Sequence, residues 1–169
     1  MTEVLATALK APVDMLPDIV RAGCLSPEDE NLWIPLGNDT WSLPLCLNIS
    51  EGYWVHLLKA RKAGFINRHR HSSPVHVFTL KGRWHYPEKD WTAEAGTYVF
   101  EPPGDTHTLR VPEGGAEMIF LANVKGTLLY VDDSGNPTGF DDVFTRIESA
   151  RAHYEAIGLG GDYVRHFIR

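Results

Sequence analysis

Cysteine is scarce in this chain of 169 residues, which contains only Cys24 and Cys46. Two cysteines this far apart are too few for a disulfide framework or for a metal site made of thiolates. We expect both to be free thiols that behave as small hydrophobic side chains. The cysteines therefore indicate neither a disulfide-bonded domain nor a zinc-thiolate site.

Long apolar runs and an excess of positive charge are also missing. No segment approaches the apolar length needed to span a bilayer, and residues 1–10 lack the basic-then-apolar pattern of a signal peptide. The formal net charge is -6, and the lysine and arginine residues are scattered along the chain. We therefore expect a cytoplasmic protein that binds neither nucleic acid nor membranes.

The composition, with 43% hydrophobic and 22% charged residues, is typical of one globular domain. From Asn31 onward, short runs rich in aromatic and β-branched residues alternate with turn signals such as Gly37-Asn38-Asp39. This pattern predicts an all-β fold, a small antiparallel barrel or sandwich. The predicted strands cover residues 32–36, 41–49, 53–60, 67–71, 75–81, 83–86, 97–101, 106–111, 117–123 and 127–131.

One helix is predicted near the carboxyl terminus, after a turn cluster at residues 132–137. Its apolar residues recur at intervals of four, three, four and three, and so share one helix face: Val143, Ile147, Ala150, Tyr154 and Ile157. Asp141 or Asp142 can cap its start, and Gly158 is typical of its end. The apolar face must pack on the barrel or on another subunit.

The chain therefore divides into three parts. Residues 1–30 form an N-terminal arm that lies on the domain, residues 31–135 form the β-barrel, and residues 136–169 form the C-terminal helical segment.

Three histidines carry the strongest functional signal. His69 and His71 are two apart in a predicted strand, so both imidazoles project from one face of the sheet. His107 follows the turn sequence Pro102-Pro103-Gly104-Asp105, which would reverse the chain before a new strand. We interpret these residues as ligands of one metal ion, against the alternative of ordinary core or surface histidines.

These segments resemble the two motifs of the cupin family, G-x5-H-x-H-x3/4-E-x6-G and G-x5-P-x-G-x2-H-x3-N. The second motif matches at Gly96, Pro102, Gly104 and His107, and departs at Val111, where the family has asparagine. The first matches at His69, His71 and Gly82, with Gly64 one residue too close. The resemblance implies a small cupin β-barrel, or jelly roll, that holds a metal.

The glutamate of the first motif is missing. The spacing from His71 to Gly82 places Val75 at its position, and valine cannot bind a metal. His76 is adjacent but points to the other face by strand alternation, unless Pro74 marks a bulge that shifts the facing. We therefore predict a site of three histidines with nothing anionic among the ligands, and keep His76 as a less favoured fourth ligand.

Three neutral imidazoles leave a divalent ion its full charge and several open positions, which favours a chelating, ionisable substrate such as a hydroxyketone or β-diketone. Fe(II) could also supply electrons to O2, which zinc cannot. Imidazole suits Zn(II) and Ni(II) as well, so the spacing does not identify the metal.

The stretch from Trp33 to His107 resembles the cupin subgroup that contains acetylacetone dioxygenase and, most closely, 2,4'-dihydroxyacetophenone dioxygenase. This resemblance implies a non-haem Fe(II) enzyme that uses O2 to cleave a small aromatic hydroxyketone into 4-hydroxybenzoate and formate. It also implies a role for Glu101, six residues before His107, in orienting a ligand or a metal-bound water. The alternative is that Glu101 is an ordinary surface acid.

Several alternatives stay open. A zinc-binding sensor cupin like those of some bacterial anti-sigma factors resembles the same region, and a β-diketone dioxygenase or a metal-dependent isomerase or lyase would use the same fold. The resemblance to the cupin family also implies a homodimer or homotetramer. Six aromatic residues near the motifs are candidates for lining a substrate pocket, although a barrel core needs such residues too: Phe78, Trp84, Tyr86, Trp91, Tyr98 and Phe100.

Overall fold

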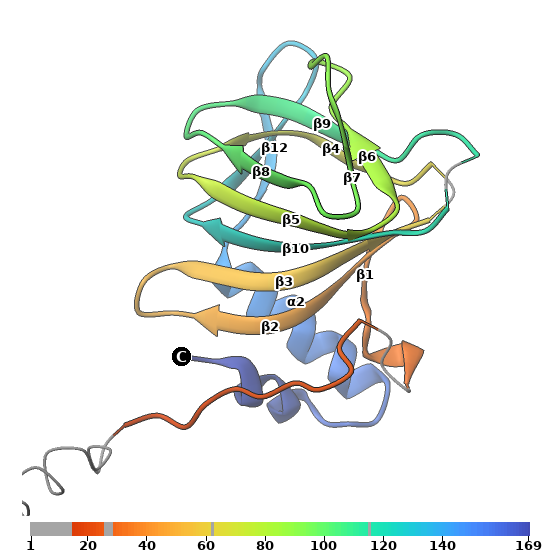
Figure 1. The fold of residues 1–169 in the computed structure, drawn as a ribbon. Coiled ribbons are helices and arrows are strands. Elements are labelled where there is room, and N and C mark those ends of the chain that lie inside the picture. Colours follow the sequence, from red (N-terminus) through yellow and green to blue (C-terminus); the bar gives the residue numbers. More distant parts are fainter. Residues whose placement is uncertain (1–14, 26–28, 62, 115) are drawn as a thin grey trace, which may run out of the picture.

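Two six-stranded sheets with antiparallel strand pairs face each other across the interior (Figure 1). The structure is a computed structural model and describes residues 15–25, 29–61, 63–114 and 116–169. The first sheet contains, in spatial order, β1 (Ile34–Gly37), β2 (Thr40–Asn48), β3 (Tyr53–Ala60), β10 (Met118–Lys125), β5 (Val75–Lys81) and β8 (Tyr98–Glu101). The second contains β12 (Pro137–Asp141), β11 (Leu128–Val131), β4 (Phe65–His71), β9 (Thr106–Arg110), β6 (Arg83–His85) and β7 (Thr92–Glu94).

The core between the sheets follows from residue alternation along the strands. In β5, Val75, Val77 and Thr79 are buried, whereas His76 and Phe78 are exposed. Trp84 lies in this core and satisfies its indole N–H by donating to the Thr79 hydroxyl at 2.9 Å. The predicted all-β fold with a C-terminal helix is confirmed.

Two strands have no counterpart in the predicted set, β7 and β12. Neither shows a run of buried alternate residues, and every residue of β12 except Asp141 is exposed. β12 is a strand because its backbone pairs with β11. This pairing leaves no pattern in the side chains of β12 from which the strand could be predicted. The second sheet consequently continues beyond residue 135, where the sequence placed the end of the barrel.

The C-terminal helix α2 (Val143–Ala156) is capped at its start by Asp142, whose carboxylate accepts from the backbone N–H groups of Phe144 and Thr145. It ends just before Gly158, which has a φ of 83°. Its buried face contacts β1, β2 and β12, so the helix packs on the barrel, which is one of the two predicted alternatives. The burial of Arg146 in this face was not expected.

A short 3-10 helix, η1 (Glu30–Leu32), precedes β1, and another, η2 (Gly161–Phe167), follows α2. The described part of the arm, residues 15–25, runs beside η2, where Arg169 donates to the Pro17 carbonyl at 2.8 Å (Figure 1). The rest of the predicted arm, residues 1–14 and 26–28, lies outside the described residues. Within the described ranges, none of the helices combines the length and the apolar character that crossing a membrane requires.

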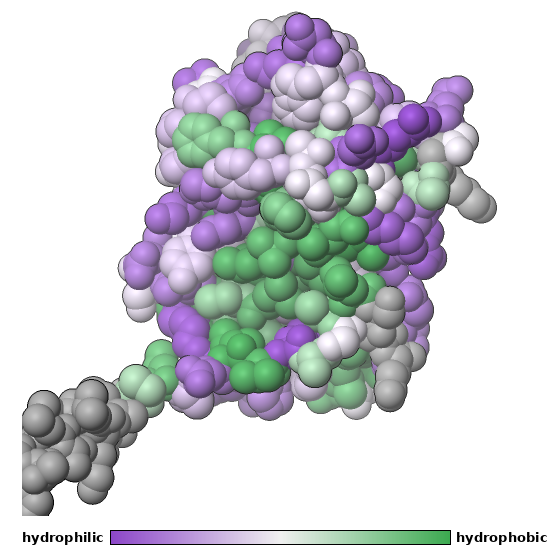
Figure 2. All heavy atoms as spheres, in the orientation of Figure 1, coloured by the Kyte–Doolittle hydropathy of each residue, from purple (hydrophilic) through white to green (hydrophobic). Residues whose placement is uncertain are grey.

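The outer face of the first sheet carries a second apolar layer. Leu43, Leu57 and Ile119 are buried with Trp33 in a cluster separate from the interior core. Figure 2 shows apolar side chains gathered on this face over β2, β3 and β10. Three further aromatic residues on β5 and β8 are exposed: Phe78, Tyr98 and Phe100.

Candidate metal centre

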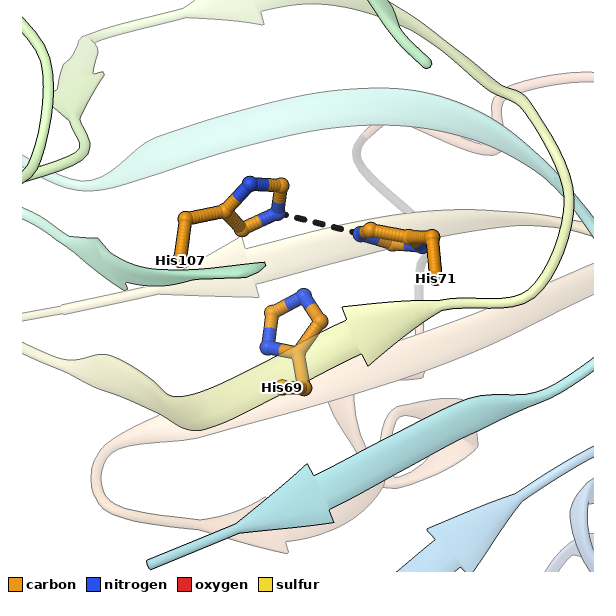
Figure 3. A group of neighbouring side chains, drawn as sticks. All are labelled: His69, His71 and His107. Carbon is orange, nitrogen blue, oxygen red and sulfur yellow. Dashed lines mark hydrogen bonds between the residues drawn. The ribbon is translucent and has the colours of Figure 1, made fainter. Parts of the chain in front are cut away.

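The three predicted histidines meet between the two sheets. His69 in β4 is the cross-strand partner of His107 in β9, and His71 follows two residues later on the same face of β4. All three are buried, and one ligand nitrogen from each lies within 4.8 Å of the others. Figure 3 shows the three rings turned toward a common point.

The turn before β9 places His107. Gly104 has a φ of 86°, a left-handed conformation that favours glycine. The backbone N–H of Gly104 donates to the His71 carbonyl at 2.8 Å, and the His71 N–H donates to the Asp105 carbonyl at 3.2 Å. These bonds tie the turn to the end of β4, so that His107 enters its strand directly beside His69.

Hydrogen bonds at the far side of two rings determine which nitrogen faces the centre. The Nδ1–H of His69 donates to the Asn67 carbonyl at 2.7 Å, and the Nδ1–H of His107 donates to the Asp105 carboxylate at 3.3 Å. Each bond leaves the Nε2 lone pair free, as metal-binding histidines require.

The central contact between His71 and His107 fits a bound cation. Their Nε2 atoms are only 3.0 Å apart in a buried environment (Figure 3). Two nitrogen lone pairs at that distance repel unless a proton or a metal ion lies between them. Among the described residues, the buried Nδ1 of His71 also has no hydrogen-bond partner. Three imidazoles suit divalent iron, nickel, copper or zinc.

A carboxylate lies beside the three histidines. Glu101 is 4% exposed, and its Oε2 atom lies 2.9 Å from Nε2 of His71 and 3.7 Å from Nε2 of His107. In the register of β5 with β8, Glu101 pairs with Val75, the residue at the glutamate position of the first motif. A carboxylate from the neighbouring strand thus faces the cluster, and the alternative of a surface acid is excluded.

Tyr86 links this carboxylate to the histidines. Its hydroxyl donates to Glu101 Oε1, and its ring stacks on His107 with centroids 3.8 Å apart. Burial, reinforced by the charge of Glu101, raises the pKa of Tyr86 far above its ordinary value, so the hydroxyl stays protonated. Although burial opposes it, the hydrogen bond and charge of His71 hold the pKa of Glu101 below its usual range.

Burial keeps the imidazoles of His69 and His107 neutral. It lowers the pKa of His69 to about 3, helped by the charges of His71 and His107. Burial likewise lowers the pKa of His107, although Glu101 opposes the shift. Neutral imidazoles are the form that binds metal, so protons compete weakly for these two nitrogens at neutral pH.

The remaining candidates lie elsewhere. His76 is exposed on the opposite face of β5, where its Nδ1 atom is 2.8 Å from the Tyr98 hydroxyl, so the structure does not bring it to the cluster. Phe78, Tyr98 and Phe100 are likewise on the exterior. Of the six aromatic candidates, Tyr86 lines the cavity at the histidines.

A cavity of about 50 Å³ adjoins the cluster. Two of the polar residues that line it, His56 and Arg146, were not predicted from the sequence as part of the site. His56 is buried in β3 with Nδ1 2.7 Å from the Ser42 hydroxyl. The sequence did offer a signal for the burial of His56, because this residue lies at an alternate position of the predicted strand 53–60, on the face that points inward. Arg146 gave no such signal, because it precedes the predicted apolar stripe residue Ile147.

His56 should make the metal-free protein sensitive to acid. Burial, then the charge of Arg146, lowers its pKa from 6.5 to about 3. Between these values the unfolded chain binds a proton that the folded chain does not, so stability falls as pH decreases through this window. We expect His56→Asn to reduce the slope of the unfolding free energy by about 1.4 kcal/mol per pH unit there. Urea unfolding at several pH values tests this, and an unchanged slope would contradict it.

Residues 24–126 match the family described as the ChrR cupin-like domain. This segment runs through the end of β10 and contains the three histidines and Glu101. Among curated proteins, none matches the chain.

Solved structures that resemble this chain include the following two. An RmlC-like cupin protein from Ralstonia eutropha JMP134 shares 31% sequence identity, with a TM-score of 0.70 over 81% of this chain and 89% of that chain. An acetylacetone dioxygenase from Acinetobacter johnsonii shares 19% identity, with a TM-score of 0.68 over 83% of this chain and 99% of that chain. At 19% identity, the second likeness shows the fold alone.

Proposed function

We propose that this chain, which belongs to the ChrR cupin-like domain family, is a non-haem Fe(II)-dependent dioxygenase. Its proposed substrate is a small aromatic hydroxyketone, and 2,4'-dihydroxyacetophenone is the particular compound we favour. In the proposed reaction O2 cleaves the bond between the carbonyl and hydroxymethyl carbons. One molecule each of ketone and O2 gives one 4-hydroxybenzoate, one formate and two protons, which balances all atoms and charges.

The observation that carries this proposal is the buried cluster of three imidazoles next to a cavity. His69, His71 and His107 would hold the ion through Nε2 and leave positions open toward the cavity. Iron(II) bound there would supply electrons to O2 and attract an anionic, chelating ketone. The fold shared with an acetylacetone dioxygenase also supports the proposal.

The surrounding side chains prepare the site. Asn67 and Asp105 hold the rings of His69 and His107 in the tautomer that presents Nε2. Tyr86 keeps Glu101 oriented toward His71 by donating a hydrogen bond from its hydroxyl to that carboxylate. Apolar cavity walls such as Val77, Phe120 and Leu109 exclude water, which strengthens each electrostatic interaction inside.

Oxygen consumption tests the proposed reaction. Protein loaded anaerobically with Fe(II) and mixed with 2,4'-dihydroxyacetophenone is expected to take up one O2 per ketone when O2 is admitted. An oxygen electrode follows the uptake, and chromatography measures 4-hydroxybenzoate and formate. The zinc-loaded protein is the matched control and should consume none. Absence of O2 uptake by the iron form, together with tight binding of one zinc ion per chain, would contradict the proposal.

A non-enzymatic zinc-binding regulatory cupin is the second candidate. The family description names ChrR, and the cavity at the histidines is only about 50 Å³, small for a substrate. The same oxygen experiment separates the two candidates.

A homodimer or homotetramer stays a prediction. The apolar face of α2 is buried on the barrel, so that face is not free for a partner. The apolar outer face of the first sheet, with Phe78 and Phe100 exposed, supports self-association instead.

A further inference from the structure

His56 lies between two cavities inside the barrel. Its side chain lines the inner cavity of about 50 Å³ that also contains His69 and His71. It lines a smaller cavity of about 10 Å³ as well, together with Ser42. His56 is only 5% exposed, and a polar side chain so deeply buried costs free energy unless its polar atoms find partners. Both nitrogens of its ring therefore need a partner.

One of the two nitrogens has a partner in the protein. Nδ1 of His56 lies 2.7 Å from the hydroxyl of Ser42. Ser42 is buried, and its hydroxyl makes no other hydrogen bond among the described residues, so its proton has no other acceptor there. Ser42 thus donates to Nδ1. The ring is neutral because burial and the charge of Arg146 lower its pKa to about 3, so its one proton is on Nε2.

The other nitrogen, Nε2, faces the inner cavity. Within the described part of the chain it has no hydrogen-bond partner, and it is not one of the fully enclosed unpaired atoms, so it borders open space. The two nitrogens of an imidazole lie on nearly opposite edges of the ring. The Nδ1 edge of His56 faces Ser42, which lines the smaller cavity and not the inner one. The Nε2–H group is thus an unused donor directed into the inner cavity.

The size of the inner cavity limits what can accept from this donor. A single water needs about 10–15 Å³ on this measure, so the cavity has room for a ligand of about three non-hydrogen atoms beside a metal ion. Apolar side chains, among them Val77, Leu109 and Phe120, form much of the remaining wall and offer no hydrogen bonds. An aromatic ring is too large for this space.

The charges around the cavity favour an anion. The carboxylate of Glu101 lies 2.9 Å from Nε2 of His71, but it compensates only one of the two charges of a divalent ion held by the histidines. A net attraction for a monoanion remains. An anionic oxygen also makes the strongest hydrogen bond with an N–H donor. Formate has the required size, a single negative charge and two accepting oxygens.

We propose that the inner cavity binds a small carboxylate of the size of formate, which accepts a hydrogen bond from Nε2–H of His56 on the side away from the metal ligands. His56 is then a ligand-binding residue and not a metal ligand. The inference rests on the proposed function only in its choice of formate, because the proposed reaction releases formate.

Titration of the Co(II)-loaded protein with sodium formate tests the inference without O2, since the visible absorption of Co(II) changes when a ligand binds to the ion. We expect His56→Asn to weaken formate binding about tenfold or more, because asparagine can replace Nδ1 but cannot reach the ligand. His56→Gln should retain part of the affinity, because its amide nitrogen can take the place of Nε2. Sodium benzoate should leave the spectrum unchanged at concentrations that saturate with formate.

His76→Asn is the matched control, since it makes the same change at an exposed position on the outer face of β5. It should bind formate like the wild type. Binding of benzoate as tightly as formate, or of neither, by the wild type overturns the inference, and this result needs no variant to fold. Equal formate affinity of His56→Asn and the wild type overturns it too. Formate binding that depends on His56, without O2 uptake by the iron protein, would overturn the dioxygenase proposal alone.

Discussion

Replacing His107 by alanine is expected to lower metal affinity by well over about 100-fold, more than the 10–100-fold typical of losing a partner of a ligand. His107 is fully buried, and its Nε2 lies 3.0 Å from that of His71, so its removal leaves two imidazoles and an open gap. His69→Ala and His71→Ala should behave alike. Elemental analysis after dialysis and competition with a chromophoric chelator measure the effect, and circular dichroism checks the fold.

His76→Ala is the control for this series. His76 is an imidazole of the same chain region but is exposed on the outer face of β5, so metal content should be unchanged. Loss of metal in the His76 variant, or its retention in the His107 variant, would show that the ligand set is wrong.

The second large effect is expected from Glu101→Gln. This change keeps the shape of the side chain and removes a buried negative charge 2.9 Å from Nε2 of His71. A buried cation loses the charge that compensates it, so we expect metal affinity to fall about 10–100-fold. Competition with a chelator at neutral pH measures the change.

Tyr86→Phe separates the charge from its orientation. It removes the hydroxyl that donates to Glu101 and leaves the carboxylate and the ring stacked on His107 in place. A net hydrogen bond contributes about 0.5–1.5 kcal/mol, so the loss in affinity should be roughly tenfold at most.

The Glu101→Gln prediction has one contradicting outcome. If that variant bound metal as tightly as the wild type, the carboxylate would have no part in holding the ion.

Local sequence was sufficient to predict much of the barrel. Strands β3 and β5 begin and end at the predicted residues. In β5 the side chains alternate between buried and exposed, whereas residues 56–60 of β3 are all buried. The same alternation put His69 and His71 on one face and His76 on the other. The turn at residues 102–105 predicted, from turn chemistry alone, the new strand that contains His107, and β9 begins at Thr106 as predicted.

Strand β12 and Arg146 were beyond such reasoning. β12 is mostly exposed on both faces, so it has no hydrophobic period and owes its existence to pairing with β11. Arg146 is buried because α2 covers the barrel beside Asp141, which supplies the compensating carboxylate. Both features depend on contacts between different elements, whereas the residue period of a helix or strand describes one element at a time.

By itself the sequence predicted three imidazoles on two strands as candidate metal ligands, and an all-β fold that brings them together, because residue period and turn chemistry are local properties. The tertiary structure decided the charge around them. The motif glutamate is absent at Val75, yet the antiparallel register of β5 with β8 places Glu101 opposite that residue and beside His71. Cross-strand register brings together groups far apart in the chain, and a buried charge acts strongly on whatever lies within a few ångströms of it.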